Sequence, residues 1–131
     1  MASGGRPRSG TRERILEVAL DLFAEEGFAG TTISAVERKV GLAAGTGSFH
    51  RHFRSKEELL HAAVDHEVTR IMAAAEAERA ALPQLDDPDA GAAQAYEQAL
   101  RDIQRFDRLF RLLLTEGDRL PELRATMSRA L

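Results

Sequence analysis

Apolar residues recur along the chain at helical spacing and do not alternate over any useful length, so the pattern predicts helices and no strands. The first predicted helix covers residues 12–26 and ends at Gly27. Its apolar positions are Ile15, Leu16, Ala19, Leu20, Leu22 and Phe23. A short second helix follows, with Thr31 and Thr32 as N-cap candidates and Gly41 at its end. Its apolar positions are Ile33, Val36 and Val40.

A much longer helix is predicted to begin after Ser55. Ser55 and Glu58 have the spacing of a capping box, in which the serine hydroxyl serves the first turn and the glutamate reaches back to the cap. The apolar pattern then continues to about Ala81, before Pro83. At 1.5 Å per residue this helix is roughly 39 Å long. Since that exceeds what a compact three-helix unit needs, we expect it to join two parts of a larger molecule.

The C-terminal third is predicted to be helical as well. Residues 83–91 have the composition of a turn, and a further helix is expected over 92–105. The densely apolar segment 106–114 ends at Gly117, and Pro121 is well placed in the first turn of a last helix.

Charge is distributed unevenly over the 131 residues, although the net charge is only −3. Residues 1–14 hold four arginines against the single acid Glu13, and residues 38–56 hold five cations and no acid. Residues 1–10 also lack periodicity, which predicts a disordered basic tail. Such asymmetry can form a basic patch on an acidic protein, but basic stretches of this size also occur on many solvated surfaces.

Several function classes are disfavoured by composition. The chain has no cysteine, which excludes disulfides, thiolate metal sites and a cysteine nucleophile. His61 and His66 lie five apart, off the spacing that places two ligands on one helix face, so we expect no metal and no cofactor. No catalytic set can be assembled, so we expect no enzyme. No apolar run approaches the roughly 20 residues of a membrane span and no signal peptide is present, so a cytoplasmic protein without membrane contact is expected.

The segment GLAAGTGSFHRHF, from Gly41 to Phe53, joins a glycine-rich half to an aromatic and basic half. The glycines favour a turn, after which a third helix is predicted. Phe49 and Phe53 lie four apart and are expected to pack inward, which leaves the polar residues around them facing outward. Three short helices with a glycine-containing turn between the second and the third outline a helix-turn-helix unit.

An ordered series of motifs supports this interpretation. The motifs are RIL at 14–16, LFAEEGF at 22–28, TTI at 31–33, GL at 41–42, GSFHRHF at 47–53 and SKEELL at 55–60. Together they resemble the N-terminal DNA-binding domain of TetR-family transcriptional repressors. The resemblance covers a little over a third of the chain, from Ile15 to Leu60.

The resemblance implies an all-α protein with two domains. Residues 11–55 would be the helix-turn-helix domain, and residues 56–131 a helical ligand-binding and dimerisation domain that the long helix begins. Family members usually run well beyond this length, so the second domain is expected to be incomplete. Either the chain is truncated, or the pocket and the dimer interface are abbreviated. The implied function is a homodimeric repressor that binds double-stranded operator DNA and responds to a small apolar or amphipathic effector.

The resemblance also implies roles for individual residues. Thr32 and Lys56 occupy positions that bind DNA phosphate, and His50 stands where the family usually has a tyrosine that touches phosphate. Arg51 is our candidate base reader, because a guanidinium can bond O6 and N7 of guanine together. The implied DNA-facing positions are Thr32, Thr46, Gly47, Ser48, His50, Arg51, His52 and Lys56.

One feature departs from the family pattern. Gly41 and Gly47 are separated by five residues, two more than in the commonest turn of the family, and the usual serine cap is absent. Either the turn is longer or the third helix starts differently, which bears on Ala44, Gly45 and Thr46.

Candidate effector contacts come only from apolar helical spacing, which is also typical of an ordinary core. They are Val68, Ile71, Met72, Tyr96, Leu100, Ile103 and Phe110. A helical module that binds small molecules or proteins without DNA remains the alternative, and the acid-free basic run at 38–56 argues against it.

Overall fold

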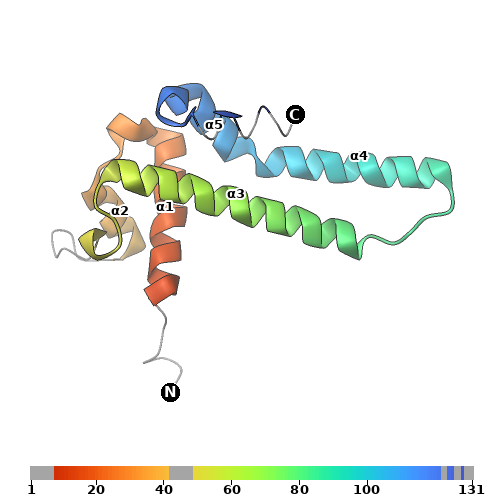
Figure 1. Cartoon of the computed structure of the whole chain (residues 1–131), viewed down its shortest axis with the longest axis horizontal. Coiled ribbons are helices and arrows are strands. Elements are labelled where there is room, and N and C mark those ends of the chain that lie inside the picture. Colours follow the sequence, from red (N-terminus) through yellow and green to blue (C-terminus); the bar gives the residue numbers. More distant parts are fainter. Residues whose placement is uncertain (1–7, 42–48, 122–123, 126–127, 129–131) are drawn as a thin grey trace, which may run out of the picture.

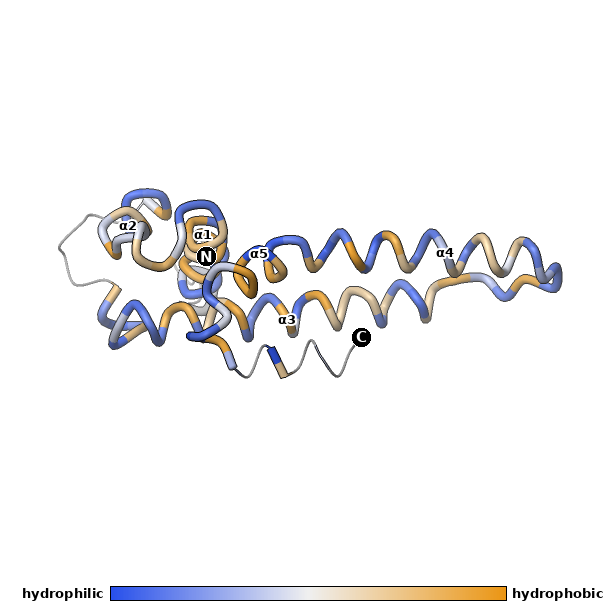
Figure 2. Tube along the Cα trace, turned by 90° about the horizontal axis from the view of Figure 1, so that it is seen from above, coloured by the Kyte–Doolittle hydropathy of each residue, from blue (hydrophilic) through white to orange (hydrophobic). Residues whose placement is uncertain are grey.

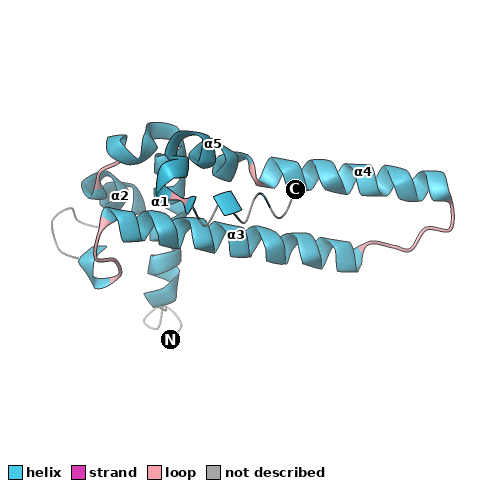
Figure 3. Cartoon of the chain, turned by 45° about the horizontal axis from the view of Figure 1, so that its top comes forward, coloured by secondary structure: helices cyan, strands magenta, loops and turns pink. Residues whose placement is uncertain are grey.

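A computed structural model describes residues 8–41, 49–121, 124, 125 and 128, and every regular element in them is helical (Figures 1 and 3). The predicted all-α class is therefore confirmed. The elements are α1 (Arg8–Gly30), α2 (Ile33–Val40), the 3₁₀ turn η1 (Phe49–Arg51), α3 (Lys56–Ala81), α4 (Pro88–Arg105), α5 (Asp107–Glu116) and the 3₁₀ turn η2 (Gly117–Arg119). The last predicted helix, from Pro121, falls largely outside the described residues.

α1 differs from its predicted span at both ends. It begins at Arg8, so residues 8–10 are helical and do not belong to the predicted disordered tail. A helix that has already formed gains one hydrogen bond for each residue it adds, which explains growth beyond the apolar repeat. Gly27 interrupts the helix as predicted, because its φ of 79° and ψ of 166° are not helical. One further short turn follows it, up to Gly30.

The side chains that cap α2 and α3 are those predicted from the sequence. Thr32 is the N-cap of α2 and accepts from Ala35 N at 3.0 Å, while Gly41 ends the helix with a φ of 94°. Ser55 caps α3 by accepting from Glu58 N at 3.0 Å. The return bond of the capping box differs, because the Glu58 carboxylate accepts from Arg54 N at 3.2 Å and not from the cap itself.

α4 begins earlier than predicted. Residues 83–91 were expected to form a turn, but Asp87 caps the helix and Pro88 occupies its first turn. The carboxylate of Asp87 accepts from Asp89 N at 3.3 Å. Proline is favoured at this position because its ring fixes a helical φ and its missing N–H has no helical partner there.

One core joins α1, α2, η1, the first half of α3 and α5. Its largest fully buried side chains are Phe23, Phe49, Phe53, Ile15, Leu16, Leu20, Leu59, Leu60, Ile71, Leu109, Leu112 and Leu120. Leu109 and Leu112 bring α5 into this core, where it packs along α1. α5 is therefore part of the body that carries the helix-turn-helix segment.

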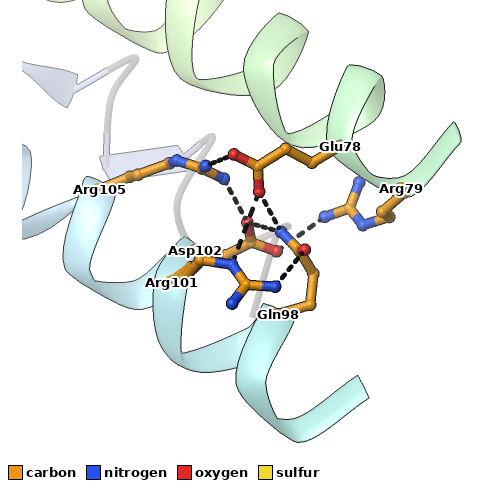
Figure 4. Close-up of polar contacts among 6 residues, drawn as sticks. All are labelled: Glu78, Arg79, Gln98, Arg101, Asp102 and Arg105. Carbon is orange, nitrogen blue, oxygen red and sulfur yellow. Dashed lines mark hydrogen bonds and ion pairs between the residues drawn. The ribbon is translucent and has the colours of Figure 1, made fainter. Parts of the chain in front are cut away.

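The second half of α3 and α4 extend from this body as an antiparallel pair, which we call the arm (Figures 1 and 2). The contacts that hold the arm together are polar (Figure 4). Gln98 is buried and donates to Glu78 Oε2 at 3.0 Å and to Asp102 Oδ1 at 3.1 Å. Arg105 binds the same two carboxylates, and Arg79 Nη2 lies 3.0 Å from Asp102 Oδ2. α4 thus turns a polar face toward α3.

Candidate DNA-binding surface

Two phenylalanines fix the backbone of the reading segment. Phe49 and Phe53 are fully buried with ring centroids 5.6 Å apart, which confirms that both belong to the core. His52 N and Phe53 N both donate to Phe49 O, at 2.9 and 3.0 Å, and this closes the 3₁₀ turn. His50 and Arg51 are exposed and His52 is half-buried, so the turn presents polar groups to solvent.

Part of the predicted reading helix lies outside the described residues. Thr46, Gly47 and Ser48 belong to that segment, as do Ala44 and Gly45 of the longer turn. The described part of the reading segment is therefore η1 and the residues that connect it to α3.

Thr32 stands exposed at the start of α2. Its hydroxyl oxygen accepts from Ala35 N, so its own proton remains free to donate. The first N–H groups of a helix lack helical partners and carry the positive end of the helix dipole. Such a terminus is suited to a phosphate oxygen.

Lys56, an implied phosphate contact, also binds the backbone of its own fold. Its Nζ donates to Phe28 O at 2.7 Å and to Thr31 O at 3.0 Å, and it lies 4.2 Å from the centroid of the Phe28 ring. An ammonium has three donors, so one remains after these two bonds. Lys56 therefore braces the turn between α1 and α2, which nothing in the local sequence indicates.

The basic residues before Arg70 and those from Arg70 onward differ in whether they form ion pairs with carboxylates. All seven arginines from Arg70 to Arg119 lie within 4 Å of a carboxylate. Within the described part of the chain, no basic residue N-terminal to Arg70 forms an ion pair with a carboxylate. Those basic residues are Arg12, Arg14, Arg38, Lys39, Arg51, Arg54 and Lys56. These cations are thus not held in ion pairs with the carboxylates that the structure describes.

Arg12 extends this basic surface onto α1. Its guanidinium carbon lies 5.2 Å from the centroid of the Phe53 ring, and its side chain is exposed. A cation over an aromatic face is held by the ring quadrupole. Sequence analysis missed this position because Arg12 and Phe53 are far apart along the chain.

The candidate effector residues divide between two environments. Ile71 is buried in the core, and Val68 and Phe110 pack partly buried against it. Met72 and Leu100 are exposed, as are Tyr96 and Ile103, whose exposed fractions are 66% and 61%. The four exposed residues form part of the surface of the arm.

Residues 15–63 match the family model described as "Bacterial regulatory proteins, tetR family". Residues 15–63 are thus similar to the DNA-binding domain of TetR-family regulators. The match begins within α1 and ends in the first half of α3, so it includes the reading segment and both capped helix starts.

Two curated relatives are similar to this part of the chain. The uncharacterized HTH-type transcriptional regulator YerO of Bacillus subtilis (strain 168) is 40% identical over 61 residues, which are 47% of this chain and 20% of the relative. The HTH-type transcriptional repressor KstR2 of Rhodococcus jostii (strain RHA1) is 38% identical over 53 residues, which are 40% of this chain and 25% of the relative. The matched segment thus spans a quarter or less of these proteins. No solved structure gives a significant match.

None of the described helices combines the length and the apolar character that a membrane span requires.

Proposed function

We propose that the protein is a sequence-specific, DNA-binding transcriptional regulator. The observation that carries this proposal is a set of basic residues in the helix-turn-helix segment that form no ion pair with a described carboxylate. They lie next to exposed polar groups on a backbone that Phe49 and Phe53 hold in place. Neutralisation of phosphates by Lys and Arg supplies most of the non-specific affinity of proteins for DNA. The similarity to TetR-family domains supports the same function.

DNA would meet the surface formed by the start of α2 and the reading segment. Arg51 would read guanine in the major groove, while Thr32 and His50 would bind phosphate. Thr46, Gly47, Ser48 and His52 complete the proposed contacts. The remaining donor of Lys56 would reach phosphate while its other donors hold the fold.

The proposal extends to a homodimeric, effector-responsive repressor that works in the cytoplasm. Two reading heads would occupy half-sites about one helical turn of DNA apart, or a multiple of it. An apolar or amphipathic effector would bind among the seven candidate effector residues. It would favour a spacing of the two helix-turn-helix segments that does not fit the half-sites. Such coupling between two sites is typically ~1–3 kcal/mol. The name of the KstR2 relative supports the repressor role, and the exposed apolar residues of the arm support a partner in that region.

A salt titration of duplex binding tests the proposal. We expect the affinity for a DNA duplex to fall steeply between about 50 and 200 mM salt, because several phosphates are contacted. Arg12→Gln should reduce the salt slope by about one, whereas the control Arg14→Gln, on another face of α1, should change it little. A flat salt response, or no binding in low salt, would instead favour the helical module that does not bind DNA.

A further inference from the structure

Several hydrogen bonds hold the turn between α1 and α2. Gly27 adopts a φ of 79° and a ψ of 166°, a conformation that only glycine adopts readily. Its carbonyl oxygen accepts from Thr31 Oγ1 at 2.8 Å, while Phe28 O accepts from Thr31 N at 3.3 Å and from Lys56 Nζ. These bonds fix the backbone that leads directly into the N-cap Thr32.

α5 contributes a further contact to this turn from 88 residues away. Phe28 N donates to Glu116 Oε1 at 3.0 Å, at the point where α5 ends. The other carboxylate oxygen, Oε2, lies 3.3 Å from Arg119 Nε. Arg119 in turn places its guanidinium carbon 4.3 Å from the centroid of the Phe28 ring. Glu116 and Arg119 thus hold both the backbone and the side chain of Phe28.

We propose that Glu116 is a positioning residue for DNA binding. Its carboxylate holds the turn at Phe28, so that the start of α2 and the hydroxyl of Thr32 face a DNA phosphate. The inference rests on the proposed DNA-binding function and assigns a role to a residue outside the helix-turn-helix segment. Glu116 acts through Thr32 and does not itself touch DNA, because a carboxylate would repel phosphate.

The position of Glu116 depends on α5, whose Leu109 and Leu112 are anchored in the core. Only Phe106 separates α5 from α4. A displacement of α4 in the arm therefore reaches the turn at Phe28 through α5.

Two substitutions at Glu116 separate its bond from its charge. Glu116→Ala removes the acceptor, and we expect the affinity for an operator duplex to fall by about three- to tenfold, as for one lost hydrogen bond. Glu116→Gln keeps an acceptor oxygen but removes a negative charge, so it should bind DNA as tightly as the wild type or more tightly. Loss of charge alone would strengthen binding in both variants, so opposite effects identify the hydrogen bond.

A double-mutant cycle tests whether Glu116 acts through Thr32. Glu116→Ala combined with Thr32→Val should weaken binding by less than the sum of the single effects, whereas its combination with Arg51→Ala should be additive. Stoichiometric titration gives the active fraction of each variant, so that partial unfolding is not counted as lost affinity. If Glu116→Ala does not fold, Glu116→Asp, which keeps the charge and shortens the reach, should show the weaker binding and replace it in the cycle.

Equal or tighter binding by a folded Glu116→Ala or Glu116→Asp variant would overturn the inference, as would an additive effect with Thr32→Val. If the proposed DNA-binding function itself is wrong, the wild-type chain binds no duplex in low salt, which distinguishes that outcome from failure of the Glu116 inference.

Discussion

Arg108 connects three helices, and its removal is expected to destabilise the protein markedly. It lies in the first turn of α5 and donates to Asp21 of α1 and to Glu67 of α3. Glu67 is only 2% exposed, and its other oxygen accepts from Arg70 Nε at 2.7 Å. Burial by itself lowers the pKa of Arg108, but the bonds to Asp21 and Glu67 outweigh it and raise the pKa, so the guanidinium stays charged.

Arg108→Met keeps much of the aliphatic stem and removes both ionic bonds. One oxygen of the buried Glu67 carboxylate then loses its charged partner, while Arg70 still binds the other. A hydrogen bond to a charged group is worth about 1.5–3 kcal/mol. The side chain of Asp21 is 43% exposed, so the bond to Asp21 contributes little more. We expect a loss of about 2 kcal/mol in the free energy of unfolding, which lowers Tm by roughly 6–10 °C for a chain of this length.

Thermal unfolding followed by circular dichroism at neutral pH measures this loss. Arg111→Met is the matched control, because Arg111 lies on the same helix and pairs with Asp107 at 2.8 Å, with both side chains at least half exposed. Such an i,i+4 surface pair is worth about 0.3–0.5 kcal/mol. Equal, small shifts of Tm in the two variants would refute the claim that Arg108 holds the three helices together.

Three further predictions concern the helix-turn-helix segment and the arm. Gly27→Ala should destabilise the fold by about 1–3 kcal/mol in urea unfolding because of its backbone conformation. The same change at Gly91, in a helix with open space around it, should be neutral or stabilising, and similar losses at both sites would contradict the argument. Arg51→Ala should cost roughly 1–3 kcal/mol of DNA binding and relax sequence preference. Lys56→Ala should weaken all duplexes about equally and also lower Tm, and unchanged preference in both variants would reduce Arg51 to a phosphate contact. The Gln98 hydrogen bond, and then Arg105, lower the pKa of Glu78, so the polar contacts of the arm should persist above the ordinary glutamate pKa and weaken as pH falls through the lowered value. Faster amide exchange in α4 on acidification, beyond the intrinsic change of the exchange rate, would show this weakening, and protection independent of pH would contradict it.

Local signals in the sequence predicted much of the fold. The breaks at Gly27 and Gly41, the caps at Thr32 and Ser55, and the inward packing of the two phenylalanines follow from spacing and backbone chemistry within a few residues. The start of α4 was misplaced although its signal was present, since Asp87 followed by Pro88 is typical of a helix start.

The periodicity of apolar residues does not predict which residues far apart in the sequence contact each other. Lys56 turns toward Phe28, 28 residues away, and Glu116 bonds to the same residue across 88 positions. The residues next to Lys56 and Glu116 in the sequence give no sign of either contact. The arm shows the same limit, because the apolar spacing of Tyr96, Leu100 and Ile103 on α4 fits either an effector site or a core, whereas these residues are exposed and polar residues of α4 contact α3. Which face of an amphipathic helix is covered depends on the helices that pack against it.

Selection of bound duplexes from a random DNA pool is the most direct test of sequence-specific DNA binding by this protein. We expect strong enrichment of one sequence motif, with guanine at a position where Arg51→Ala loses preference. Two-fold symmetric half-sites about one helical turn apart would additionally support the dimer. A bound pool that remains as random as the input pool, at low salt and with a folded protein, would contradict sequence-specific DNA binding.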